Sequence, residues 1–136
     1  MTKKSYEELL SKIEEKHRIV GKYLLKMIEN DHKYRIDYSS LTESLGEKID
    51  WHVGLPHLLG DISSLCFYLK LPMISVVVIN KSEARPGNGF FKLYDIYHDT
   101  HCAGNLELEI KIEEEERLNV INCKDWSKLK EILDIE

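Results

Sequence analysis

One segment of the chain carries residues of the types that bind magnesium beside a phosphate. Asp95 is followed fourteen residues later by Glu109, and Lys111 comes two residues after that. Carboxylates bind Mg²⁺, and a lysine stabilises the charge on an attacked phosphate. An alternating strand would place Glu109 and Lys111 on one face. Glu107 and Glu113 continue the same face as an ordinary solvated ladder, so a magnesium-dependent nuclease is the third of three hypotheses and no catalytic residue is assigned.

A second cluster holds the residue types that zinc prefers. His98, His101 and Cys102 lie within five positions, and Cys123 follows further along. Structural zinc sites normally pair ligands in two places, and only one pair is visible here, so we predict no metal and no cofactor. Cys102 and His101 are adjacent, which on a strand points them to opposite sides and disfavours a nucleophile and base pair.

A glycine-rich turn gathers the basic residues of the second half of the chain. Lys81, Arg85 and Lys92 lie within twelve positions, around Pro86-Gly87-Asn88-Gly89. Exposed backbone amides beside basic side chains suit a phosphate or an acidic partner. The alternative is an ordinary hairpin turn. We predict that Lys81, Arg85, Asn88 and Lys92 contact a partner.

Four successive acidic residues, Glu113, Glu114, Glu115 and Glu116, form a negatively charged run, and we predict that they also contact a partner. The chain has 19 Lys and Arg against 24 Asp and Glu, a formal net charge of −5, and the acidic surplus lies in residues 71–136. Nucleic-acid binding normally needs a positive surface, so this balance disfavours a general nucleic-acid binder. An acidic run is either a solvated surface or an imitation of phosphates that competes for a nucleic-acid site.

The length and composition predict one globular domain over residues 1–136. The chain is 43% hydrophobic and 32% charged, which is enough to build a core. Three widely spaced cysteines and an N-terminus without an apolar signal region favour reduced thiols in the cytoplasm. The longest apolar run, near residues 73–79, is far shorter than the ~20 residues of a membrane span, so no membrane contact is expected.

Hydrophobic periodicity predicts an α+β fold with N-terminal helices, an antiparallel sheet of about four strands and a C-terminal helix. Residues 106–112 alternate Leu or Ile with Glu or Lys, which is typical of a half-exposed strand. The predicted helices are 4–30, 40–45, 56–70 and one that begins at Asp125 or Ser127, and the predicted strands are 73–80, 90–98, 106–112 and 117–123.

The segments Leu71–Lys81, Pro86–Phe91 and Asp125–Ser127 together resemble a pattern in small bacterial and phage proteins that have no established activity. A more distant resemblance links Tyr38, Leu41, Leu45-Gly46 and Pro72 to the winged-helix domain of alkylguanine alkyltransferase-like proteins. That family has a reactive Cys-His-Arg motif after the proline, where this chain reads Met73-Ile74-Ser75. The resemblance therefore implies no alkyl transfer.

These observations favour a non-enzymatic interaction protein with a protein partner, in its sharpest form a phage or mobile-element inhibitor of a host nucleic-acid-targeting defence enzyme. The first alternative is a winged-helix-like nucleic-acid-binding module. A homodimer through apolar residues such as Trp51, Phe67 and Tyr68 is a further alternative for the partner.

Overall fold

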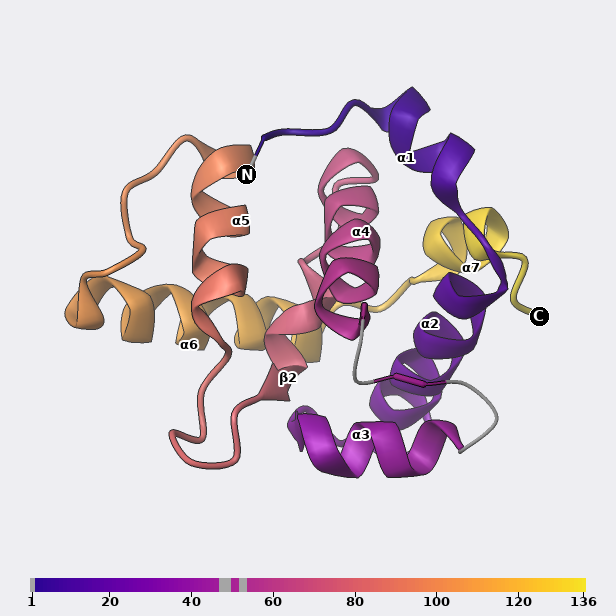
Figure 1. The fold of residues 1–136 in the computed structure, drawn as a ribbon, viewed down its shortest axis with the longest axis horizontal. Helices are drawn as coiled ribbons and strands as arrows, with labels where there is room; N and C mark the ends of the chain where they lie inside the picture. Colours follow the sequence, from indigo (N-terminus) through magenta and orange to yellow (C-terminus); the bar gives the residue numbers. More distant parts are fainter. Residues whose placement is uncertain (1, 47–49, 52–53) are drawn as a thin grey trace.

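The computed structural model describes residues 2–46, 50–51 and 54–136, which form seven α-helices, one 3-10 helix and two very short strands (Figure 1). The elements in chain order are α1 (Tyr6–Lys12), α2 (Glu15–Glu29), β1 (Ile36–Asp37), α3 (Tyr38–Leu45), α4 (Leu55–Tyr68), η1 (Ile74–Val77), β2 (Val78–Ile79), α5 (Asn88–His98), α6 (Leu106–Asn122) and α7 (Ser127–Leu133).

The predicted antiparallel sheet of about four strands is wrong. Among the described residues the strands form one parallel pair, in which Ile36 lies opposite Val78 and Asp37 opposite Ile79. The segment 73–80 was expected to be a buried strand, but half of it is the 3-10 helix η1 and only Val78–Ile79 form a strand. All four side chains of η1 are buried. When every residue of an apolar segment is buried, hydrophobic periodicity cannot distinguish a strand from a helix.

The segment 90–98, predicted to be a strand, lies in helix α5. Phe90, Phe91, Leu93 and Tyr97 are its buried residues. Their spacing of one, three and seven positions from Phe90 is that of a helix face. The aromatic content of this segment favours strands in general, but the periodicity of its buried positions decides the structure.

The segments 106–112 and 117–123, predicted to be two strands, belong mostly to the single helix α6. Leu, Glu and Lys are all good helix formers, so the Leu-Glu alternation is compatible with a helix. Asn105 caps this helix by accepting a hydrogen bond from the Leu108 backbone amide at 3.2 Å, and Glu107 and Glu109 follow in the first turn, where the helix dipole favours acids. Local helix signals therefore outweigh the alternation.

The helices predicted at 40–45, at 56–70 and near the C-terminus are confirmed in outline by α3, α4 and α7. Pro56 occupies the first turn of α4, where a proline costs no hydrogen bond. The helix predicted over 4–30 is divided, because Ile13 and Glu14 have extended backbone conformations between α1 and α2.

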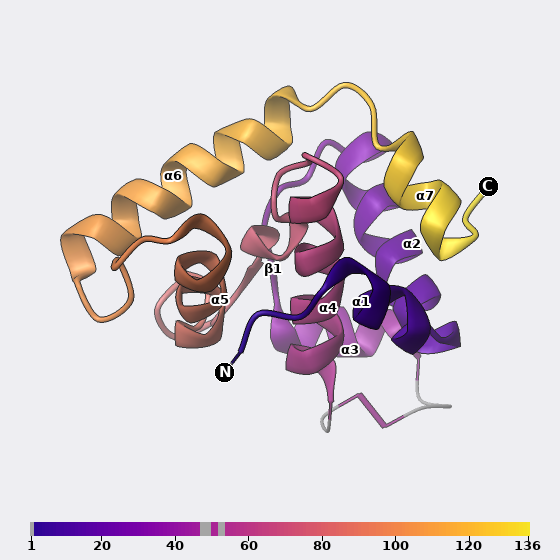
Figure 2. The same ribbon diagram turned by 90° about the horizontal axis from the view of Figure 1, so that it is seen from above.

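Helix α4 lies at the centre of the molecule and contacts α1, α2, α5 and η1 (Figure 2). Helix α2 also contacts α3 and α7, and α6 packs on η1 along one edge of the molecule. The buried apolar side chains of these elements form one core cluster. None of the described helices is both long enough and apolar enough to cross a membrane.

Candidate interaction surface

The basic turn between β2 and α5 is partly used inside the molecule. Lys81, Asn88 and Lys92 are exposed, as a partner-binding role requires. Arg85 is half-buried instead, and its Nη2 lies 2.5 Å from Glu109 Oε1 on α6. The partner role predicted for the three exposed residues stays a prediction, whereas Arg85 already has an acidic partner within the chain.

The glutamate run is divided by the helix that contains it. Glu113 and Glu116 face inward and are each 6% exposed, while Glu114 and Glu115 are exposed to solvent. Adjacent residues on a helix point about 100° apart, so four successive glutamates must cover more than one face. Glu114 and Glu115 are therefore the members of the run that a partner could reach.

Arginine and glutamate side chains attach the inner face of α6 to the rest of the molecule. Arg117 Nη1 donates to Glu113 Oε2 at 2.6 Å, and Arg117 Nη2 donates to the Val76 carbonyl at 3.0 Å. Its Nε donates to the Tyr34 carbonyl at 3.3 Å. One buried guanidinium thus joins α6 to η1 and to the segment that leads into β1.

The remaining inward carboxylates bind backbone amides. Glu116 Oε2 accepts from the Met73 amide at 3.2 Å, and Glu109 Oε2 accepts from the Gly104 amide at 2.8 Å. Buried carboxylates need such donors, because an unpaired buried charge is expensive. Each buried charged side chain on the inner face of α6 therefore has a hydrogen-bond partner elsewhere in the chain or on the same helix.

The outer face of α6 carries a stripe of exposed aliphatic side chains, which we call the α6 stripe. Its members recur at helical spacing within about a third of the circumference of the helix, and Glu114 lies among them. They are Leu106, Ile110, Leu118 and Ile121, with exposures of 58%, 40%, 55% and 39%. This face was missed because the segment was interpreted as strands, although the intervals of four, eight and three residues could have indicated it.

The position of α6 leaves the stripe accessible. In Figures 1 and 2 this helix lies along the edge of the molecule, with its first turns extending beyond α5. Glu107 and Lys111 are also exposed, so charged side chains of both signs lie close to the stripe. Trp51, expected to be a contact for a second copy, is instead buried in the core.

The three residues of the nuclease hypothesis do not share one face, although Asp95 and Glu109 accept hydrogen bonds from the adjacent amides of Ala103 and Gly104. The pKa of Asp95 is raised by burial, but hydrogen bonds from Thr100, Cys102 and Ala103 outweigh burial and lower it to about 2. Glu109 points inward to Arg85. Lys111, two positions along a helix and so about 200° away, points outward. The shared face that a strand would have provided is therefore not formed.

The histidine and cysteine cluster also has other partners. His98 stacks on Tyr94 with ring centroids 4.0 Å apart, and the Cys102 thiol lies 3.9 Å from the Phe91 carbonyl. Burial is the main cause that raises the pKa of Cys102 to about 12, which disfavours a thiolate nucleophile. Within the described part of the chain, no group of three His, Cys, Asp or Glu residues is arranged to hold a metal ion.

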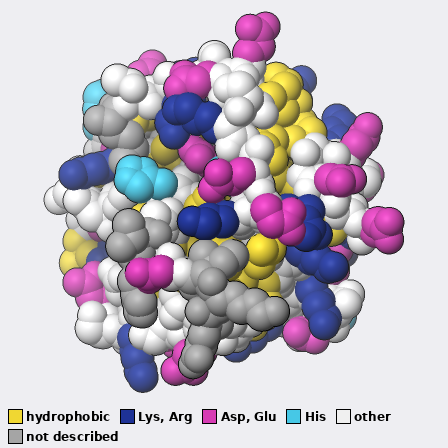
Figure 3. All heavy atoms as spheres, turned by 45° about the vertical axis from the view of Figure 1, so that its right-hand side comes forward, with side chains coloured by type: hydrophobic (Ala, Val, Ile, Leu, Met, Phe, Trp, Pro, Cys, Tyr) yellow, Lys and Arg dark blue, Asp and Glu magenta, His cyan; other side chains and the backbone are white. Residues whose placement is uncertain are grey.

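Helix α2 carries a row of basic side chains that was not predicted from the sequence. Arg18, Lys22 and Lys26 recur every four residues and line a groove of about 310 Å³ beside Tyr23 and Leu45. Arg18 is also paired with Glu15. Across the face shown in Figure 3, acidic and basic side chains are interspersed with apolar patches, so this face carries both signs of charge.

Comparison with protein-family models, with curated proteins and with solved structures finds no match to this chain.

Proposed function

We propose that this chain is a non-enzymatic interaction protein and that a protein partner docks on the α6 stripe. The observation that carries the proposal is the unusual polarity of α6, in which four of the five buried residues are charged, namely Glu109, Glu113, Glu116 and Arg117, while Leu106, Ile110, Leu118 and Ile121 are exposed. Contiguous exposed apolar surface is costly in water and commonly marks an interaction site. The inward network fixes the orientation of α6 and so holds the stripe outward.

The dimensions and charges of the stripe specify the chemistry of the partner. A helix of 17 residues is about 25 Å long, which suits an amphipathic helix docked alongside it. Glu114 lies between Ile110 and Leu118, and Glu107 is beside Leu106. We therefore infer a partner helix with aliphatic anchors and a basic residue opposite Glu114.

A second copy of this chain fits the stripe less well. Glu114 is the midpoint of Leu106–Asn122, so an antiparallel pair of α6 helices related by a two-fold axis would place Glu114 against the same residue of the other copy. Like charges in contact oppose association. Charge complementarity thus favours a basic partner over a homodimer.

The inhibitor form of this proposal relies on acidic groups that imitate phosphates. Glu114 and Glu115 are the exposed pair of the run and lie beside the stripe, so a basic, nucleic-acid-binding surface is the type of partner that would suit them. The nucleic-acid-binding alternative draws instead on Lys22 and Lys26 of α2 and on Lys81 and Lys92.

The test compares what the wild-type protein and two variants capture. Tagged wild type, Leu118→Gln/Ile121→Gln and the control Leu10→Gln are incubated with a bacterial lysate, with and without nuclease, and the captured species are identified by mass spectrometry. Leu10 is an exposed leucine on α1 (40%), so its substitution alters surface hydrophobicity away from α6. We expect a stoichiometric protein that survives nuclease, is lost with the α6 variant and is retained by the control.

The captured protein is then purified and its affinity for the wild type is measured, with Glu114→Lys as a third variant. Reversing this charge should weaken binding at least tenfold. A captured protein that binds all variants equally overturns the α6 proposal, and recovery that depends on nucleic acid favours the alternative. Concentration-dependent self-association that the α6 variant abolishes would replace the foreign partner by a second copy.

A further inference from the structure

A cavity of about 380 Å³ lies between α4, α5 and the residues that precede α1. Its wall is mostly apolar, and its polar groups include one carboxylate. The principal lining residues are Leu59, Val78, Phe90, Leu93, Tyr97 and Asp61. An apolar cavity of this size with a few convergent polar groups has the properties of a small-molecule site.

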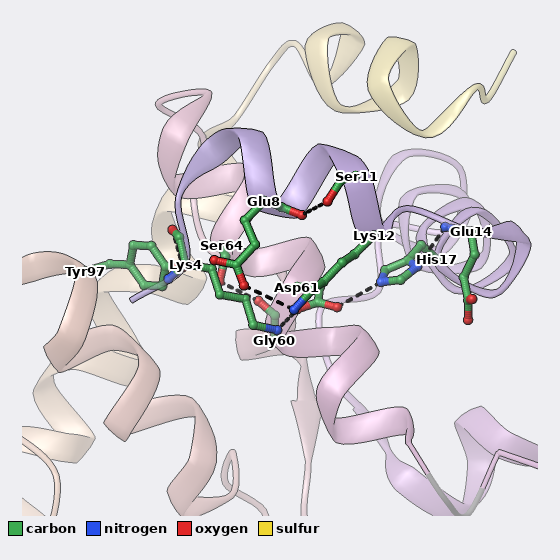
Figure 4. A network of polar contacts seen from close by, with 10 residues as sticks. All are labelled: Lys4, Glu8, Ser11, Lys12, Glu14, His17, Gly60, Asp61, Ser64 and Tyr97. Atoms are coloured by element: carbon green, nitrogen blue, oxygen red, sulfur yellow. Dashed lines mark hydrogen bonds and ion pairs between the residues drawn. The ribbon is translucent and has the colours of Figure 1, made fainter. Parts of the chain in front are cut away.

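Asp61 of α4 is the fixed charge of this cavity. Its side chain is 14% exposed, with Oδ1 2.8 Å from Lys4 Nζ and Oδ2 3.0 Å from His17 Nε2 (Figure 4). Burial raises the pKa of Asp61, but the hydrogen bonds from His17 and Lys4 outweigh burial and lower it. The carboxylate is therefore held in its ionised form.

His17 orients this carboxylate without neutralising it. The Glu14 backbone N–H can only donate, and it lies 3.1 Å from His17 Nδ1, so Nδ1 accepts and the ring proton is on Nε2. The ring is thus neutral in this arrangement and donates to Asp61. The positive charge bound to Asp61 comes from Lys4.

Lys4 belongs to a segment outside the helices. The segment is held by its backbone, since Tyr68 donates its hydroxyl hydrogen to the Lys4 carbonyl at 2.6 Å and the Lys4 amide donates to the Tyr97 hydroxyl at 3.2 Å. The Lys4 side chain itself is 32% exposed and lines the cavity. Its ammonium group can leave Asp61 while the backbone contacts remain.

We propose that this cavity binds a small, mainly apolar amine whose ammonium group replaces that of Lys4 on Asp61. The aliphatic stem and ammonium of Lys4 already make this contact from within the chain, so an amine ligand would reproduce it. An anionic ligand would have to draw Lys4 away and leave the buried Asp61 charge unpaired, which is expensive. The geometry thus favours a cationic ligand over an anionic one.

The experiment uses benzylamine, which is protonated at pH 7, and the variant Lys4→Met, which removes the ammonium and keeps most of the stem. Binding is followed by the backbone amide NMR shifts of cavity residues such as Gly60 and Gly89. We expect saturable shifts at these amides in Lys4→Met and at least tenfold weaker binding to the wild type, where Lys4 competes. Benzyl alcohol, of the same shape but neutral, should bind neither protein detectably.

Two further variants separate this contact from general effects. Lys12→Met removes a lysine from a surface ion pair with Glu8 and should bind benzylamine no better than the wild type. Adding Asp61→Asn to Lys4→Met should abolish binding. If Lys4→Met is not folded, Lys4→Gln takes its place with the same expected result.

The proposal is overturned if benzylamine leaves the cavity amides unshifted in the Lys4 variant. It is also overturned if benzyl alcohol binds equally well, or if the Asp61→Asn double variant retains binding.

Discussion

Helices α4 and α6 are buried in opposite ways. Helix α4 buries eight residues, which are aliphatic, small or hydroxyl-bearing, and none of them is charged. Helix α6 is longer and buries five, of which four are Glu109, Glu113, Glu116 and Arg117. One helix is stabilised by non-directional removal of apolar surface from water, and the other by directional contacts between charged groups.

This difference between the helices assigns the two faces of α6 to different roles, the inner face to stability and the outer face to partner binding. An apolar inner face can tolerate small shifts, whereas the network of Arg117 requires Glu113, Val76 and Tyr34 in fixed positions. Because charged groups form most of the inner face of α6, several of its aliphatic side chains are left on the outer surface. We therefore expect inner and outer substitutions on α6 to have very different effects on folding.

The largest loss of stability is expected for Arg117→Met. This change leaves the Glu113 carboxylate, which is 7% exposed as a side chain, without its 2.6 Å partner. It also removes the donors from the buried Val76 carbonyl and the partly buried Tyr34 carbonyl. Removing one partner of a buried ion pair costs about 3–5 kcal/mol. Urea unfolding monitored by circular dichroism measures the change in the free energy of unfolding.

Adding Glu113→Leu to Arg117→Met removes a buried carboxylate whose remaining ion-pair partner, Arg85 Nε, lies 3.9 Å away, and gives the matched control. The double variant should recover about 1–2 kcal/mol, because an apolar pair avoids the desolvation cost of a lone carboxylate. A double variant that is less stable than Arg117→Met would contradict the role assigned to the charge and indicate that Glu113 acts through its other contacts.

The corresponding test in α4 is Ile62→Ala, which removes apolar volume at a position that is 0% exposed. The expected cost is about 3 kcal/mol, from lost transfer free energy and the cavity left behind. Thermal and urea unfolding should agree on this value at any salt concentration, because no charge is involved. A loss below about 1 kcal/mol would show that the centre of the molecule repacks easily.

A smaller effect is expected for Asp95→Asn, in α5, whose carboxylate binds the loop that leads to α6. Asp95 accepts hydrogen bonds from Thr100, Cys102 and Ala103 at 2.6–2.8 Å, and the variant should lose about 1–2 kcal/mol. The folded-state pKa of about 2 lies below that of the unfolded chain, near 4. The ionised group therefore stabilises the fold above about pH 4, and its contribution is lost as the pH falls towards 2.

Unfolding curves at pH 7, 4 and 2 check this dependence. The difference in stability between wild type and Asp95→Asn should be largest at pH 7 and should shrink at pH 2. A difference that stays constant with pH would mean that the loop depends on the shape of the side chain and not on its charge.

The contrast between α4 and α6 also explains how far the sequence predicted the fold. The helix around Leu58 and Ile62 was predicted because its apolar residues recur at helical spacing and Pro56 marks its start. In α6 the same method failed, because the alternation over residues 106–112 was interpreted as a strand and because charged residues form most of the inner face. Once Glu113 and Arg117 take the inner face, hydrophobic periodicity describes the wrong side of the helix.

The candidate sites were likewise predicted from the sequence only in part. From the sequence, Arg85 and the glutamate run were predicted to bind a partner molecule. In the structure, Arg85 and Glu113 instead form ion pairs within the chain, with Glu109 and Arg117. Which carboxylates stay exposed depends on contacts between distant segments, such as that of Glu116 with the Met73 amide. The cavity at Asp61 was not predictable, because Lys4, His17 and Asp61 are brought together only by tertiary packing.

The smallest effect on folding is expected for Leu118→Gln/Ile121→Gln on the outer face of α6. Both side chains are already exposed, and glutamine is a good helix former, so the free energy of unfolding should change by less than about 0.5 kcal/mol per site. The same residues should nevertheless decide partner binding. A loss of binding with unchanged stability, measured on one preparation, assigns the stripe to interaction, whereas a stability loss near that of Ile62→Ala would mean that these residues serve the fold.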